Sequence, residues 1–208
     1  MALSKEDGFK IREEYSTIKE KMVCDKHNLV QLGGSRTKVD GFSDNKNVSI
    51  KNASGVSTQV HLTTQKSFIE SFSMDSNCVE FIKLFCGNEH INNFGRDRYQ
   101  IKQIDSDLVN SFKLFLNENK EKIIDLIIRN GHNITHIIFN DIKKDKEYQL
   151  TYDEIIKKVN DCEWVFMDGG IHLKNGNKKT YFHFQREGKK SKTNRYNVLW
   201  HIHKNLFI

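Results

Sequence analysis

The chain has 208 residues, of which 37% are hydrophobic and 29% are charged, and it contains no proline. This composition is typical of a folded globular protein, and the length fits one domain, residues 1–208, with a sizeable core. The longest apolar runs are too short to cross a bilayer and the N-terminus lacks a secretory signal, so we expect no membrane partner and a cytoplasmic location. The four cysteines have no Cys-x-x-Cys spacing, which argues against a zinc finger and favours reduced thiols.

The net charge of +6 is concentrated towards the C-terminal end of the sequence. Between Lys174 and Lys204, nine lysine and arginine residues accompany one acid, Glu187, so this segment carries +8 and the rest of the chain about −2. A basic segment on a near-neutral body is the pattern expected of a protein that binds a phosphate backbone. A solvated lysine-rich face is the alternative explanation.

The first predicted element is an amphipathic helix over Ser4–His27, because apolar residues recur there at three- and four-residue steps. Glu14 borders its apolar face, whereas Glu20 is expected to face solvent. The apolar face consists of Ile11, Tyr15, Ile18 and Met22.

A short β-hairpin is predicted over Val39–Asn52, with its turn in the polar residues at its middle. The hairpin places Asp40 close to Lys51, with Ser49 on the same face and Ile50 anchoring the other. A carboxylate beside a lysine is typical of a metal-dependent phosphodiesterase site, since the acid holds a divalent ion and the lysine stabilises charge on the phosphate. Acids and lysines that only keep a hairpin soluble are the alternative.

Further along the chain, amphipathic runs predict helices, and β-branched and aromatic runs predict strands. The expected helices are Thr63–Phe72, Asp107–Arg129 and Tyr152–Asn160, with Val79–Phe85 as either a helix or a strand. The expected strands are Val60–Leu62, Ile134–Phe139, Glu163–Asp168, Gly170–Lys174, Lys179–Arg186 and, as strand or helix, Tyr196–His203. This order predicts an α/β fold with a mixed β-sheet core flanked by helices and a strand-rich, basic C-terminal part.

Oxygen ligands from other elements would complete a Mg²⁺ site, because this ion keeps several waters and needs few protein ligands. Glu14 on the first helix is one candidate. Glu70 on the helix after the hairpin is another, with Gln65 as its substitute. Each acid also has a simpler explanation: Glu14 as an ordinary surface acid, and Glu70 as the helical partner of Lys66 four residues earlier.

The segment Ser35–Asp40 followed by Val48–Lys51 resembles the core of the PD-(D/E)XK nuclease superfamily. It is most similar to the variant with Ser-x-Lys in the second motif, found in some restriction and homing endonucleases. The resemblance covers about residues 10–72 and departs from the usual pattern at Ser49, where most members have an acid, and at Val39, where most have proline.

This resemblance implies a restriction-endonuclease-like fold, a catalytic core over about residues 10–72, and a metal site built from a helix acid, Asp40 and Lys51. We expect the carbonyl of Ile50 to complete the coordination. Some restriction enzymes with Ser-x-Lys take the missing carboxylate from the following helix, which here points to Glu70, with Gln65 as the alternative. The residues implied in catalysis are Asp40, Lys51, Glu14 and Ser49, and those implied in metal binding are Asp40, Ile50, Glu14 and Glu70.

The predicted DNA contacts lie on the strand Lys179–Arg186, on the basic loop that follows it, and in the loop before the hairpin. Alternation along the strand places Gln185 on one face and Arg186 on the other, where their side chains suit base edges. Lysines of the loop suit phosphates. A sheet edge kept soluble by lysines is the alternative. The predicted contacts are Ser35, Arg36, Gln185, Arg186, Lys189, Lys190, Lys192 and Arg195.

The sequence therefore predicts a Mg²⁺-dependent endonuclease, with Mn²⁺ as a substitute, that hydrolyses double-stranded DNA at specific sites in the manner of restriction or homing enzymes. A homodimer is expected because one small active site cuts one strand. Two alternatives stay open: a junction-resolving nuclease, and a non-catalytic nucleic-acid-binding protein. The second would be favoured if Asp40 and Lys51 pointed apart.

Overall fold

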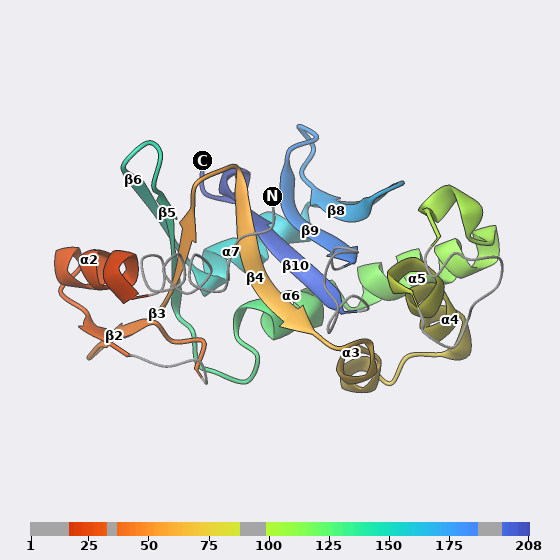
Figure 1. Ribbon diagram of the computed structural model, residues 1–208, viewed down its shortest axis with the longest axis horizontal. Coiled ribbons are helices and arrows are strands. Elements are labelled where there is room, and N and C mark those ends of the chain that lie inside the picture. Colours follow the sequence, from red (N-terminus) through yellow and green to blue (C-terminus); the bar gives the residue numbers. More distant parts are fainter. Residues whose placement is uncertain (1–16, 33–36, 88–98, 187–196) are drawn as a thin grey trace, which may run out of the picture.

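The computed structural model describes residues 17–32, 37–87, 99–186 and 197–208, whose strands form two five-stranded sheets (Figure 1). Sheet A is mixed: its strand order is β1-β2-β3-β5-β6, and β3 runs parallel to β5 while the other neighbours are antiparallel. Sheet B, of order β4-β10-β9-β8-β7, is antiparallel throughout. The α/β class, the mixed sheet and the strand-rich C-terminal part are thus confirmed, but the strands divide between two sheets rather than one.

The helices and strands that were predicted occur in the predicted order, apart from the departures described below. The strands are β1 Val30–Gln31, β2 Gly41–Ser43, β3 Lys46–Ala53, β4 Ser57–Thr63, β5 His136–Asp141, β6 Lys146–Thr151, β7 Glu163–Met167, β8 Gly170–Lys174, β9 Thr180–Arg186 and β10 Val198–His203. The helices are α2 Lys19–Lys26, α3 Gln65–Phe72, α4 Ser76–Cys86, α5 Ser106–Glu118, α6 Lys120–Ile128 and α7 Tyr152–Asn160, with short 3-10 turns η2 Ile101–Gln103 and η3 Lys204–Leu206.

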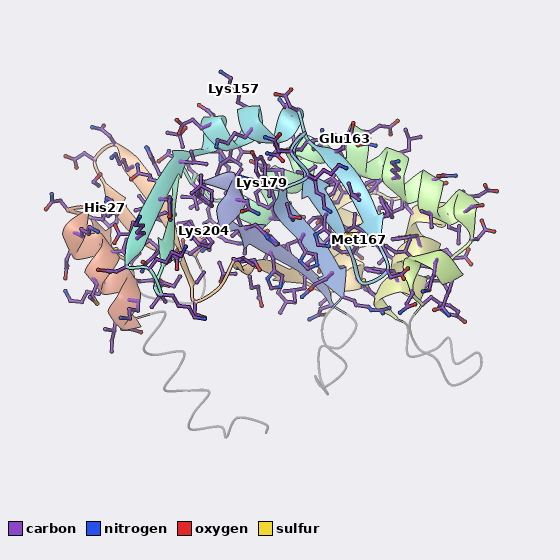
Figure 2. All side chains as sticks on the ribbon, turned by 90° about the horizontal axis from the view of Figure 1, so that it is seen from above. His27, Lys157, Glu163, Met167, Lys179 and Lys204 are labelled. Carbon is purple, nitrogen blue, oxygen red and sulfur yellow. The ribbon has the colours of Figure 1, made fainter. Side chains whose placement is uncertain are left out.

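The two sheets are joined where the chain passes from β3 into β4 through a three-residue bend, residues 54–56. A second connection comes from Lys204, labelled in Figure 2, whose ammonium pairs with Asp141 at the end of β5. Both side chains are largely buried, so this ion pair links the end of sheet B to the end of sheet A.

The first helix packs on sheet A with a different face from the one predicted. Ile18 and Met22 are 52% and 58% exposed, so the predicted apolar face does not turn towards the protein at these two positions. Val23 and Cys24 are buried instead, in a small core completed by Leu29, Val48, Ile50 and Ile138. The packing against the hairpin is close, because a Cβ placed on Gly41 would lie 2.7 Å from Cys24 Sγ.

Two other elements depart from the prediction. The single helix expected over Asp107–Arg129 is divided into α5 and α6 at Asn119, whose ψ of 17° leaves the helical range. The Asn119 side chain donates to the Phe115 carbonyl, and such local bonds compete with the helical backbone. The strand β6 was not predicted, because it is an edge strand with no buried residue and therefore has no apolar run.

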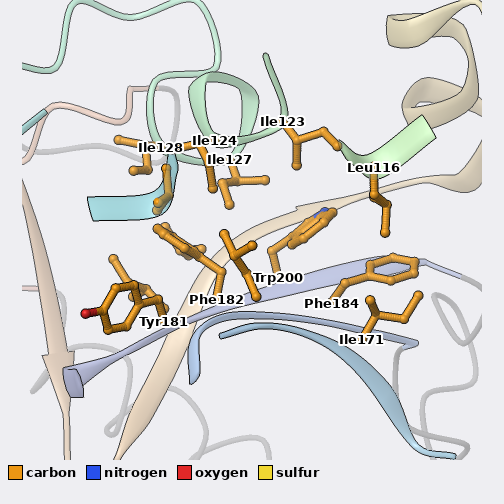
Figure 3. Packing of buried hydrophobic residues seen from close by; sticks show 14 of the residues in the cluster. Leu116, Ile123, Ile124, Ile127, Ile128, Ile171, Tyr181, Phe182, Phe184 and Trp200 are labelled. Atoms are coloured by element: carbon orange, nitrogen blue, oxygen red, sulfur yellow. The ribbon is translucent and has the colours of Figure 1, made fainter. Parts of the chain in front are cut away.

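The main core lies between sheet B and the helices that cover it. Figure 3 shows Phe182 and Trp200 of the sheet below the isoleucines of α6, and Phe184 below Leu116 of α5. Within the described part of the chain the four cysteines are buried free thiols, and no helix is long and apolar enough to span a membrane.

Candidate active site

The hairpin of β2 and β3 is built around a two-residue turn at Asp44 and Asn45. Its register pairs Gly41 with Val48, and the backbone N–H of Asp40 donates to the Val48 carbonyl at 2.8 Å. Asp40 therefore stands directly before β2, beside the middle of β3, as the sequence predicts. The turn and the register of β2 with β3 are enough to place Asp40, so its position depends on local sequence alone.

The Asp40 carboxylate gathers three donors from consecutive residues of β3. The backbone N–H of Ile50 donates to Oδ2 at 2.6 Å, the Ser49 hydroxyl at 3.1 Å and the Lys51 ammonium at 3.3 Å. The Asp40 and Lys51 side chains are only 18% and 15% exposed. The acid and the lysine thus point towards each other and form a partly buried ion pair.

Glu20 of α2 is a further carboxylate near Asp40 that was not predicted from the sequence. Burial, and then the nearby negative charge of Asp40, raise the pKa of Glu20 to about 7, while Lys51 acts in the opposite direction. Glu20 shares a helix face with Val23 and Cys24, three and four residues later, which pack on the sheet. The expectation that Glu20 faces solvent is therefore wrong, because it followed from assigning the wrong face to the helix. The predicted helix acid, Glu14, lies outside the described residues.

Lys38 lies two residues before Asp40 and extends away from the hairpin. Its ammonium donates to the carbonyl of Val60 in β4 at 2.7 Å and to that of Ile127 in α6 at 2.9 Å. Burial, followed by the charge of Lys51, lowers the pKa of Lys38 to about 7. His61 lies nearby, and burial together with the Lys38 charge lowers the pKa of His61 to about 4.

The oxygen atoms at this site suit a hard divalent cation. Two carboxylates, Asp40 and Glu20, lie close enough to interact electrostatically. The carbonyl of Ile50, the predicted third ligand, accepts a hydrogen bond from Lys51 at 3.1 Å. In the described ranges no three His, Cys, Asp or Glu side chains form a ready ligand cluster. The donor set therefore fits Mg²⁺, which is held by one or two carboxylates and keeps its waters, better than Zn²⁺.

The structure does not bring Glu70 or Gln65 to Asp40. Glu70 is 62% exposed at its side chain and lies 3.8 Å from the Lys66 ammonium, as in the simpler explanation of this acid. Gln65 donates to the Gly87 carbonyl at the end of α4. Figure 1 shows α3 well separated from α2 and β2, so the helix after the hairpin cannot supply a ligand.

Arg186 was predicted to contact a base, but the structure directs it into the protein. Its Nη1 donates to the carbonyls of Phe85 at 3.0 Å and Tyr99 at 2.7 Å, with the guanidinium 5.3 Å from the Phe85 ring centroid. Arg186 shares the core face of β9 with Phe182 and Phe184, which explains its direction. The predicted base contact of Arg186 is therefore wrong, and its role is structural.

Gln185 lies on the opposite face of β9, where its amide contacts the His201 ring at 3.1 Å. This face also carries a row of histidines on neighbouring strands: His172 stacks on His183 with ring centroids 4.3 Å apart, and His201 and His203 follow within 6 Å of His183. Burial lowers the pKa of all four, to about 3 for His183 and about 4 for His203. The remaining predicted DNA contacts, Ser35, Arg36, Lys189, Lys190, Lys192 and Arg195, lie outside the described residues.

Comparison with known proteins adds one structural similarity. No protein-family model matches the chain, and no curated protein matches its sequence. Among solved structures, the chain is similar to the restriction endonuclease MspI in complex with its cognate DNA. The TM-score is 0.49 at 12% sequence identity, and the match covers 88% of this chain and 77% of that one. At this level of similarity, activity has to be argued from the chain's own residues.

Proposed function

We propose that this chain is a Mg²⁺-dependent endonuclease that hydrolyses phosphodiester bonds of double-stranded DNA. The observation that carries the proposal is the 3.3 Å pair of Asp40 and Lys51, with Glu20 beside it. An acid and a lysine that serve only solubility stay exposed, whereas these side chains are mostly buried and point towards each other. A partly buried pair with a perturbed carboxyl beside it is a physical indication of a functional site.

In this proposal the carboxylates of Asp40 and Glu20 hold Mg²⁺ or, as a substitute, Mn²⁺. When bound, the ion neutralises phosphate charge and acidifies a water. Lys51 holds its ammonium beside Asp40, where it stabilises the negative charge that develops on the phosphate. Ser49 donates to Asp40 Oδ2 and so fixes the orientation of the carboxylate. Because Ser49 itself carries no charge, Glu20 supplies the second carboxylate.

We further propose that the enzyme cuts at specific sequences and acts as a homodimer, since one site cleaves one strand. The described lysines that suit phosphate contacts are Lys174, Lys178 and Lys179 in the β8–β9 hairpin, with Gln185 on the histidine-bearing face of β9. The PD-(D/E)XK resemblance supports the same class of reaction.

Cleavage of plasmid DNA with Mg²⁺ supplied or chelated tests this function. Asp40→Asn, Lys51→Met and Glu20→Gln should each lower the cleavage rate by about a hundredfold or more. The two amide variants lose an anionic ligand of the metal, and Lys51→Met loses the cation that stabilises the phosphate. The same hairpin supplies matched controls of the same residue types in Asp44→Asn and Lys46→Met, both at exposed positions. These controls should cleave within about twofold of the wild type.

Two outcomes would overturn the proposal: a wild-type chain that cuts no duplex with Mg²⁺ or Mn²⁺, or an Asp40→Asn variant that cuts as fast as the wild type. Discrete fragments would support site-specific cutting, whereas a smear would argue against it. Preference for a four-way junction over linear duplex would instead identify a junction-resolving nuclease. Binding of duplex without any cleavage would identify a non-catalytic DNA-binding protein.

A further inference from the structure

The Lys38 side chain joins three parts of the molecule that are far apart in sequence. It belongs to the segment that leads into Asp40, and its ammonium bonds the carbonyls of Val60 in sheet B and Ile127 at the end of α6. The Ile127 carbonyl lies in the last turn of α6, where carbonyls lack a partner within the helix and carry the negative end of the helix dipole. A lysine is well suited to satisfy such a carbonyl.

The candidate catalytic groups are attached to sheet A rather than to sheet B. Asp40 is bonded to β3 through its backbone and its carboxylate. Glu20 is carried by α2, which packs on sheet A through Val23 and Cys24. Sheet B, in contrast, carries Gln185 and the lysines of the β8–β9 hairpin, which are proposed to contact DNA. The position of the cutting groups relative to bound DNA therefore depends on how the two sheets are held together.

We propose that Lys38 is a positioning residue that fixes the Asp40 hairpin against sheet B and α6, and so aligns the cleavage site with the bound phosphate. This inference rests on the proposed nuclease function. It does not require Lys38 to touch the DNA or the metal, because its ammonium is engaged by two backbone carbonyls. A small displacement of reacting groups lowers a rate strongly, whereas it leaves each separate binding step nearly intact.

The test is Lys38→Met, which keeps the aliphatic stem and removes both bonds. We expect kcat for duplex cleavage to fall by about tenfold or more at saturating Mg²⁺, with KM for DNA within about twofold of the wild type. Because Asp40 and Glu20 stay on sheet A, the affinity for Mg²⁺ alone, measured by calorimetry without DNA, should also stay within about twofold. Additional Mg²⁺ should not restore the rate.

Lys120→Met is the matched control for a purely structural effect. Lys120 also spans two backbone carbonyls, those of Asn160 at 3.1 Å and Cys162 at 2.7 Å, but it lies at the other end of α6. Both variants should melt at a lower temperature, and only Lys38→Met should lose kcat.

The inference is overturned if Lys38→Met cleaves like the wild type, if Lys120→Met loses kcat equally, or if Mg²⁺ affinity falls in parallel with kcat. The proposed nuclease function is refuted by a different result, namely that the wild-type protein cleaves no DNA.

Discussion

The contact between α2 and the hairpin predicts the effect of a single methyl group at Gly41. A Cβ at this position would meet Cys24 Sγ at 2.7 Å and Leu29 Cβ at 3.3 Å, and both neighbours are buried. The backbone of Gly41 does not require a left-handed conformation, so the cost of Gly41→Ala is steric. Overpacking of this kind costs about 1–3 kcal/mol. For a domain of this size, each kcal/mol lowers the melting temperature by about 2–4 °C.

Chemical and thermal denaturation of Gly41→Ala, Gly55→Ala, Cys24→Ala and the double variant Cys24→Ala/Gly41→Ala measure this cost. Gly41→Ala should lose stability, and Gly55→Ala, whose Cβ meets nothing within 4 Å, should stay within about 0.5 kcal/mol of the wild type. Removing the opposing sulfur in the double variant Cys24→Ala/Gly41→Ala should recover part of the loss, with a coupling of about 0.5–3 kcal/mol. A fully stable Gly41→Ala, or an additive double variant, would refute the packing of α2 on the hairpin and with it the position of Glu20.

Two further predictions concern sheet B. Burial keeps the folded pKa of His183 and His203 at about 3 and 4, below the 6.5 of a free histidine, so the unfolded chain binds more protons between these values. The free energy of unfolding should therefore fall as pH decreases from about 6.5 to 4, and His183→Phe should flatten this dependence in urea titrations at several pH values. Arg186→Met should cost about 1–3 kcal/mol by removing the donor to the partly buried carbonyls of Phe85 and Tyr99, with little change in affinity for duplex DNA. A large loss of affinity for DNA without loss of stability would contradict the structural role and indicate that Arg186 contacts DNA.

The fold was predictable where local signals were strong. The helix α7 matches its predicted bounds because Thr151 and Glu154 form a capping box and the apolar face is regular. The break at Asn119 and the edge strand β6 were not predictable in the same way. The break depends on one side chain that bonds its own backbone, and β6 depends on pairing with β5 rather than on burial of its own residues.

The same distinction applies to the candidate site: the residues placed by local structure were predictable, and the residue placed by long-range packing was not. Asp40 and Lys51 belong to one hairpin, so alternation and turn position were sufficient to place them together. Glu20 depends on which face of α2 is buried, and the large apolar residues Ile18 and Met22 indicated the wrong one. The signal available was the spacing of Glu20 with Val23 and Cys24. The buried Cys24 lies so close to Gly41 that a Cβ at Gly41 would come within 2.7 Å of its Sγ.

The basic residues of the C-terminal segment do not all contribute positive charge to the protein surface. Arg186 shares a strand face with two core phenylalanines, and alternation alone was enough to place its guanidinium inside. Lys204 neutralises Asp141 where the two sheets meet. Both cations hold the fold together and leave less of the +8 segment for a phosphate backbone. Salt-dependent binding of duplex DNA should consequently report fewer released counterions than the sequence count of nine basic residues suggests.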